Sequence, residues 1–113
     1  MDNIIKRENI PEPVNFGKLM ETAFYIVLNL KTFKGHESFA RFFIGDQVEF
    51  ANEIFYKLKG VTDVTDNSIL QMDLVEMRDS IPINMQVIGC TLGEMAENFK
   101  IITREAFKFF TFH

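Results

Sequence analysis

A single cysteine is the residue in this sequence with the clearest potential for chemistry. Cys90 lies between Gly89 and Thr91, directly before a stretch whose pattern predicts a helix. The positive end of a helix dipole stabilises a thiolate, so Cys90 is a candidate reactive thiol. A small, buried thiol at the end of a strand is the other interpretation. A reactive Cys90 would have a pKa clearly below the roughly 8.5 of an unperturbed cysteine.

The other polar residues do not form a recognisable catalytic or metal-binding motif. His36 and His113 occupy a predicted turn and the chain end. Asp63, Asp66 and Asn67 resemble half of a calcium loop, but the later glycine and glutamate are missing. No glycine-rich phosphate loop or nucleophile elbow occurs. We therefore predict no metal, no cofactor and no assignable catalytic residue, and an enzyme that uses Cys90 is only the third-ranked interpretation.

Length and composition predict one globular domain with its own core. The chain has 113 residues, of which 47% are hydrophobic and 25% charged, so it needs no disulfide to be stable. It contains 13 Phe and 6 Met but no Trp. This choice of apolar residues predicts a Phe-rich core. The alternative is that some rings line a ligand pocket or a subunit interface.

Charge and targeting signals restrict the partners and the compartment. The net charge is −4, which disfavours a nucleic acid partner. One cysteine cannot form an intrachain disulfide, and the first residues lack the apolar segment of a secretory signal. The longest apolar run, Ala23 to Leu28, is far shorter than the roughly 20 residues of a membrane span. We expect a cytoplasmic protein with no membrane partner.

An internal repeat indicates how the elements that carry these residues are arranged. Residues 26–45 match residues 70–89 in kind at an offset of 44, and each stretch is followed by a helix-like pattern. The identical pairs are Leu30/Leu74, Ile44/Ile88 and Gly45/Gly89. Such self-similarity predicts two copies of one structural unit.

The strand assignments depend partly on this repeat. Residues 24–33 and 68–77 have the alternation and residue types of strands. Residues 39–45 fit a strand or a helix, because their phenylalanines suit both periods. Their counterpart, residues 82–88, alternates strictly, so we predict a strand for both. The alternative is one helix over residues 36–59, in a βαββα, ferredoxin-like arrangement.

Two helices complete the predicted fold. Asp46 with Glu49, and Thr91 with Glu94, have the spacing of capping boxes that begin a helix. The chain then forms an α+β, two-layer domain with the order ββαββα, in which two helices cover one face of a four-stranded, mainly antiparallel sheet. Residues 1–13 are predicted to be a flexible arm, and residues 14–113 the single domain.

The uncovered face of this sheet is predicted to be polar with apolar interruptions. The alternation places Leu28, Leu30, Met72, Leu74, Met85 and Val87 under the helices. The polar residues expected on the uncovered face are Asn29, Lys31, Gln71, Asp73, Asn84 and Gln86. The apolar interruptions expected there are Tyr25, Val27, Val75 and Ile88. This face is a candidate partner site.

The end of the chain suggests an interface. Phe107, Phe109, Phe110 and Phe112 crowd the last helix, which has only one side toward its own sheet. We expect Phe109 to face the core. The candidate interface residues are Ile101, Phe107, Phe110 and Phe112, unless the N-terminal arm covers them. The leading interpretation is a non-enzymatic interaction domain that binds itself or another protein. The alternative is a small-molecule-binding domain with a Phe/Met-lined pocket between sheet and helices.

Overall fold

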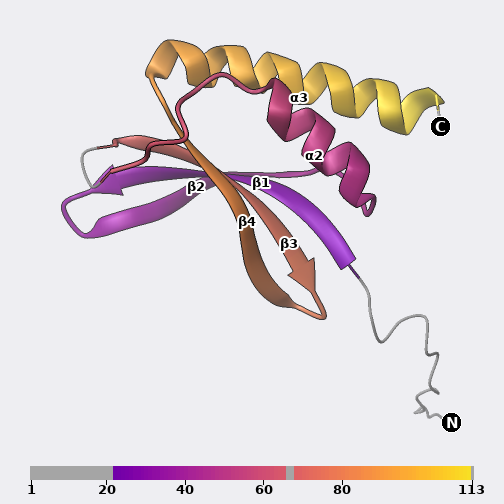
Figure 1. The fold of residues 1–113 in the computed structure, drawn as a ribbon, viewed down its shortest axis with the longest axis horizontal. Coiled ribbons are helices and arrows are strands. Elements are labelled where there is room, and N and C mark those ends of the chain that lie inside the picture. Colours follow the sequence, from indigo (N-terminus) through magenta and orange to yellow (C-terminus); the bar gives the residue numbers. More distant parts are fainter. Residues whose placement is uncertain (1–21, 66–67, 113) are drawn as a thin grey trace, which may run out of the picture.

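The computed structural model describes residues 22–65 and 68–112. The predicted N-terminal arm, residues 1–13, lies outside this part of the chain, as do residues 14–21. The described elements follow the predicted order of two strands and a helix, twice over (Figure 1). They are β1 (Thr22–Thr32), β2 (Gly35–Phe43), α2 (Val48–Lys57), β3 (Leu70–Arg78), β4 (Ile81–Cys90) and α3 (Leu92–Phe112).

The described strands form one antiparallel sheet in the order β2-β1-β3-β4. The α+β fold with the order ββαββα is therefore confirmed. β2 pairs with β1 from Gly35, opposite Thr32, to Phe43, opposite Tyr25. The alternative prediction of one helix over residues 36–59 is wrong, because residues 35–43 satisfy their backbone groups by pairing with β1. Each half is a hairpin followed by a helix, and the duplication itself stays a prediction.

Both helices lie on the same face of the sheet, and the core fills the space between (Figure 1). α2 contributes Ala51, Ile54 and Phe55, and α3 contributes Ile102. The central strands β1 and β3 supply the deepest side chains, because each has a neighbouring strand on both sides. The other members of the core are Phe24, Ile26, Leu28, Ile44, Met72, Leu74 and Ile88.

Phenylalanine contributes less to this core than its abundance suggests. Among the described side chains, only Phe24 and Phe55 are buried core phenylalanines. Ile, Leu and Met occupy most of the buried core, and Phe42, Phe50 and Phe99 pack against it while partly buried. The expectation of a Phe-rich core is therefore not supported. More than half of the side chain is exposed in Phe33, Phe39, Phe43, Phe107 and Phe110.

A β-bulge in each hairpin changes which side chains face the helices. Phe39 is the extra residue of β2, and Met85 is the extra residue of β4. An extra residue shifts the alternation of side chains by one position along the strand. Predictions based on uninterrupted alternation therefore fail beyond a bulge.

The error appears in the second half of β4. Gln86 was expected on the uncovered face, but its Nε2 donates a hydrogen bond to Asn52 Oδ1 of α2 over 2.9 Å. Ile88 was also expected there, but it is buried in the core. Val87, expected under the helices, lies opposite Asp73 on the uncovered face instead. The bulge at Met85 accounts for all three errors.

The two helix starts differ in how they are capped. Thr91 and Glu94 form the predicted capping box: the Glu94 N–H donates to Thr91 Oγ1 over 3.1 Å, and the Thr91 N–H donates to Glu94 Oε1 over 2.9 Å. The capping box predicted for Asp46 and Glu49 is wrong. The N-cap residue of α2 is Gln47, and it makes no side-chain cap hydrogen bond. Asp46 instead accepts a hydrogen bond from the side chain of Gln47.

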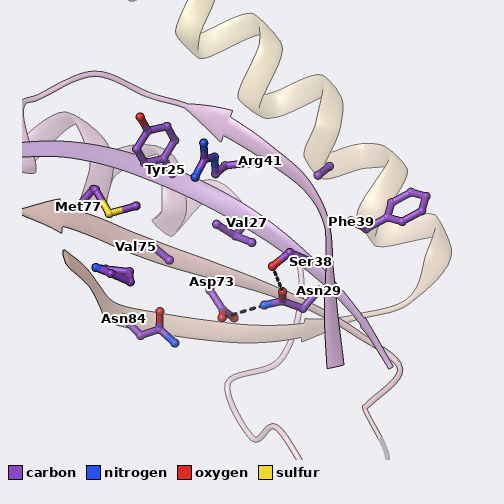
Figure 2. Close-up of a pocket in the computed structure, with 12 residues that line it drawn as sticks. Tyr25, Val27, Asn29, Ser38, Phe39, Arg41, Asp73, Val75, Met77 and Asn84 are labelled. Atoms are coloured by element: carbon purple, nitrogen blue, oxygen red, sulfur yellow. Dashed lines mark hydrogen bonds between the residues drawn. The ribbon is translucent and has the colours of Figure 1, made fainter. Parts of the chain in front are cut away.

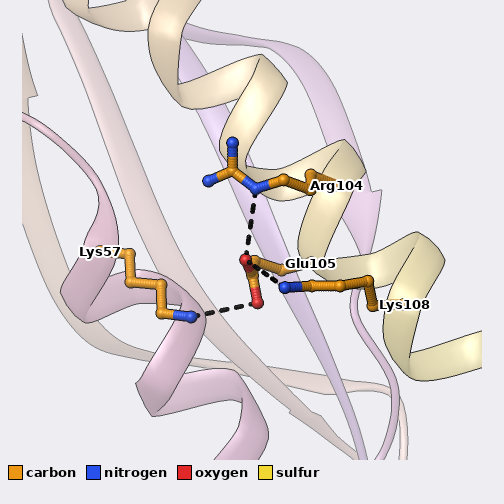
Figure 3. A network of polar contacts seen from close by, with 4 residues as sticks. All are labelled: Lys57, Arg104, Glu105 and Lys108. Carbon is orange, nitrogen blue, oxygen red and sulfur yellow. Dashed lines mark hydrogen bonds and ion pairs between the residues drawn. The ribbon is translucent and has the colours of Figure 1, made fainter.

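A buried acid links the two helices. Glu105 of α3 is 9% exposed and accepts from Lys57 Nζ of α2 over 3.1 Å (Figure 3). Arg104 and Lys108 of α3 lie 3.4 Å from its other oxygen. The hydrogen bond from Lys57 lowers the pKa of Glu105 most, and hydrogen bonds from Lys108 and Arg104 and the charge of Lys108 lower it further, although burial opposes them. Neither described helix is long and apolar enough to cross a membrane.

Candidate functional site

The face of the sheet opposite the helices carries the most unusual polar group of the described chain. Strand pairing places Arg41, Val27, Asp73 and Val87 in one row across all four strands. Neighbouring strands lie about 4.8 Å apart, so the backbones of Arg41 and Asp73 are separated by roughly 10 Å. The row therefore presents one cation and one acid, with Val27 between them (Figure 2).

The acid of this row is buried. Asp73 is 7% exposed, because it lies on central strand β3 between Val27 and Val87. Its Oδ2 accepts a hydrogen bond from Asn29 Nδ2 over 2.9 Å. Its Oδ1 is out of contact with solvent and receives no hydrogen bond from the described residues. Burial raises the pKa of Asp73, against the opposing effects of the Asn29 hydrogen bond and the charge of His36.

Side chains of three strands hold the carboxyl group in place. Ser38 Oγ of β2 donates to Asn29 Oδ1 of β1 over 3.0 Å. Asn29 in turn donates to Asp73 of β3 (Figure 2). In this series of hydrogen bonds, the Asn29 side chain accepts through its oxygen and donates through its nitrogen. The two bonds therefore define the orientation of the Asn29 amide.

The cation of the row is directed toward an aromatic ring. The guanidinium carbon of Arg41 lies 4.7 Å from the centroid of the Tyr25 ring, a cation–π arrangement. The Tyr25 ring also packs against Phe43, with centroids 5.5 Å apart. Arg41 forms no ion pair with a carboxylate of the described chain. Its charge is therefore not neutralised by an acid of the described chain.

A groove runs over this row. Its volume is about 630 Å³, within the range of small-molecule sites. Both charged residues of the row line it, together with apolar and amide side chains. The side chains that contribute to its lining include Tyr25, Val27, Asn29, Ser38, Phe39, Val75, Met77 and Asn84. We call this feature the open-face groove.

A second exposed surface lies on the outward side of α3. Ala96, Lys100, Thr103, Phe107 and Phe110 have the spacing of one helical stripe, and all are exposed. Phe107 is 62% and Phe110 52% exposed. We call these five residues the α3 stripe. A shallow hollow of about 530 Å³ borders the stripe; Phe99, Thr103 and Phe107 are part of its lining.

The structure places the predicted interface residues differently. Phe107 and Phe110 belong to the exposed α3 stripe, and Phe110 stacks on Phe43 of β2 with ring centroids 5.9 Å apart. Ile101 is only 4% exposed, so the expectation that it lies off the core side of the helix is wrong. The side chain of Phe112 lies outside the described part of the structure.

Cys90 is the last residue of β4 and is partly buried. Burial raises the pKa of its thiol, and the negative charge of Glu94 adds to that effect. Glu94 lies close because it caps the same helix start that was expected to stabilise a thiolate. The surroundings of Cys90 therefore favour the neutral thiol.

Acidic, histidine and cysteine side chains are dispersed in the described part of the chain. Residues 22–65 and 68–112 contain no group of three or more His, Cys, Asp or Glu side chains arranged to hold a metal ion. Asp66 and Asn67, two of the three residues that resemble a calcium loop, lie outside the described residues.

Sequence reasoning missed the role of two polar residues on the core side of α3. Asn98 is 0% and Glu105 9% exposed. With Ile101 and Ile102 between them they follow the helical spacing, which was the available signal. Asp73 was correctly assigned to the uncovered face, but its burial was not foreseen.

Comparison with known proteins adds no functional information. No protein-family model matches the chain. Searches of curated proteins and of solved structures found no significant match either. The class of protein is thus defined by the fold alone, an α+β domain with one covered and one open sheet face.

Proposed function

We propose that this protein is a non-catalytic interaction domain that self-associates through the α3 stripe, with a second copy of the same chain as the partner. The observation that carries the proposal is the exposure of Phe107 and Phe110 on one continuous side of the domain. Two large exposed rings on one helix face are typical of protein interfaces. The proposed setting is the cytoplasm, as the lone cysteine suggests.

The spacing of the stripe favours a second copy as the occupant. When two α3 helices pack antiparallel about a twofold axis at Thr103, Ala96 of one copy lies opposite Phe110 of the other. The same axis places Phe99 opposite Phe107 of the second copy. At each end the large Phe110 thus meets the small Ala96, the rings of Phe99 and Phe107 face each other further in, and the small Thr103 at the axis allows close approach.

The hollow and the charges agree with this arrangement. Phe107 of the second copy falls beside the hollow lined by Phe99 and Thr103. Charged residues flank the same contact. Lys108 of the second copy faces position 98 of the first, and Glu97 is the neighbouring residue, so these unlike charges come close together. Unlike charges at this place would favour the antiparallel orientation over the parallel one.

Sedimentation of the full chain between micromolar and hundreds of micromolar concentration tests the proposal. We expect a reversible dimer. Phe107→Lys should raise the dissociation constant of this dimer at least tenfold. Phe33→Lys is the matched control, because Phe33 is 99% exposed in the β1–β2 turn, away from α3. A wild-type chain that stays monomeric, or equal weakening by both variants, would overturn the proposal.

Disulfide cross-linking tests the position of the axis. In a Cys90→Ser background, Thr103→Cys should form a symmetric disulfide under mild oxidation, because facing Cα atoms at the axis come within bridging range. Lys100→Cys is the control. Its two copies would be displaced by about 9 Å along the helices and could not bridge. Preferential cross-linking of Lys100→Cys would exclude this axis.

A further inference from the structure

We propose that the open-face groove binds a small zwitterion, whose ammonium group contacts the carboxylate of Asp73 and whose carboxylate contacts the guanidinium of Arg41. An apolar chain of the ligand would lie over Val27, between the two charges. The site is on the sheet face opposite α3, so the inference is independent of the proposed self-association.

At the acid end of the groove, one oxygen of the Asp73 carboxylate receives no hydrogen bond from the described residues. Asp73 is 7% exposed, and its only described hydrogen bond is the one from Asn29 to Oδ2. A buried carboxylate oxygen without a donor is costly, and an ammonium group supplies both a donor and the opposite charge. Rotation about the Cβ–Cγ bond of Asp73 would turn the buried oxygen toward the groove and break the hydrogen bond from Asn29. The ammonium group of the ligand would then replace the lost donor.

The cationic end carries a charge of the opposite sign, which no carboxylate of residues 22–65 or 68–112 pairs with. Arg41 lines the same groove, and its described contact is with the ring of Tyr25. Stacking on a ring leaves the edge N–H groups of a guanidinium available, and their fork matches a carboxylate. A ligand carboxylate would therefore bind Arg41 without displacing Tyr25.

The separation of the two ends selects the ligand. Arg41 and Asp73 lie on either side of Val27 in one row, with backbones roughly 10 Å apart. A ligand that reaches both side chains needs its charges at opposite ends of a short chain. Val27 and Val75 provide apolar contact for that chain, and Asn84 lies across the groove from Arg41. The arrangement favours an ω-amino acid over a simple amine or a simple acid.

Titration of the full chain with three probes, followed by amide chemical shifts, tests the inference. The probes are 6-aminohexanoate, hexylammonium and hexanoate, which share a chain and differ in their charged ends. We expect saturable shifts at Asp73, Asn29 and Arg41, with 6-aminohexanoate at least tenfold tighter than either singly charged probe.

Two variants test which residue binds each charged group of the ligand. Asp73→Asn should remove the advantage of 6-aminohexanoate over hexanoate, and Arg41→Met should remove its advantage over hexylammonium. Glu53→Gln and Lys34→Met are matched controls, because both residues are exposed and outside the groove. Well-dispersed spectra of each variant would establish that it is folded.

Three results would overturn the inference: no saturable shift in the groove with 6-aminohexanoate, equal affinity for the three probes, or unchanged 6-aminohexanoate binding in both folded variants. Sedimentation in the presence of the probe separates this site from self-association. We expect binding to the groove to leave the monomer–dimer equilibrium unchanged.

Discussion

Asn98 binds both backbone groups of Lys59. Its Oδ1 accepts a hydrogen bond from the Lys59 N–H over 2.7 Å, and its Nδ2 donates to the Lys59 carbonyl over 2.9 Å. Asn98 is 0% exposed in α3, whereas Lys59 lies just beyond the end of α2. The pair therefore fixes the chain where it leaves α2 against the first half of α3.

Replacing Asn98 should destabilise the domain. Asn98→Leu fills a similar volume but leaves the two backbone groups of Lys59 without their partner, so we expect the free energy of unfolding to fall by about 2 kcal/mol. Urea unfolding measures this change. Glu53→Ala, on the exposed side of α2 and outside the α3 stripe, is the control and should change stability by less than about 0.5 kcal/mol. An Asn98→Leu variant as stable as that control would contradict the prediction.

The two helix starts should respond differently to loss of a side chain. Thr91→Ala removes the hydrogen bond that the Thr91 hydroxyl accepts from the Glu94 N–H, and we expect a loss of about 1 kcal/mol. Gln47→Ala at the start of α2 should cost much less, because Gln47 makes no cap hydrogen bond. Denaturant midpoints of the two variants provide the comparison. Equal losses would show that capping is not the cause.

Glu105 should stabilise the fold at neutral pH. Its pKa is lowered below the ordinary 4.5, first by the hydrogen bond from Lys57. A lowered pKa means that its contribution is present above the unfolded value and is lost as pH falls through the folded value. Glu105→Gln should therefore be less stable than wild type at pH 7, with a gap that closes in acid. Unfolding curves from neutral to acidic pH test this, and a gap independent of pH would refute it.

Asp73 should have the opposite pH dependence. Burial raises its pKa above the ordinary 3.8, so the folded state is penalised above the raised pKa and gains stability as pH falls through it. We expect Asp73→Asn to be more stable than wild type at neutral pH, with an advantage that shrinks on acidification. The same unfolding series measures both acids. A neutral-pH loss of stability in Asp73→Asn would mean that the ionised carboxylate is stabilising.

Cys90 should react slowly with thiol reagents. Burial, and then the charge of Glu94, raise its pKa above that of an ordinary thiol, so the thiolate is scarce at neutral pH. We expect a disulfide reagent to modify the native chain more slowly than the unfolded chain at the same pH. The ratio of the two rates is the measurement. A faster native reaction would restore Cys90 as a candidate reactive thiol.

Local patterns account for the parts of the fold that were predicted. The alternation of residues 82–88, transferred through the repeat, correctly assigned β2 as a strand. The spacing of Thr91 and Glu94 correctly predicted a capped helix. These features depend on residues that are near in sequence. They can therefore be inferred without knowledge of the partner strands.

The remaining features depend on residues far apart in the chain. The bulge at Met85 reversed the faces of Gln86, Val87 and Ile88, and a bulge becomes apparent only when the opposing strand sets the register.

The candidate site also depends on residues that are far apart in the chain. Sequence alternation alone placed Asp73 on the uncovered face, and the sequence alone indicated exposed phenylalanines at the end of α3. Only the tertiary structure buried the Asp73 carboxyl between Val27 and Val87 and set Arg41 in the same row. The physical reason is that burial and charge separation are properties of the assembled sheet, whereas helix and strand periods are properties of a short segment.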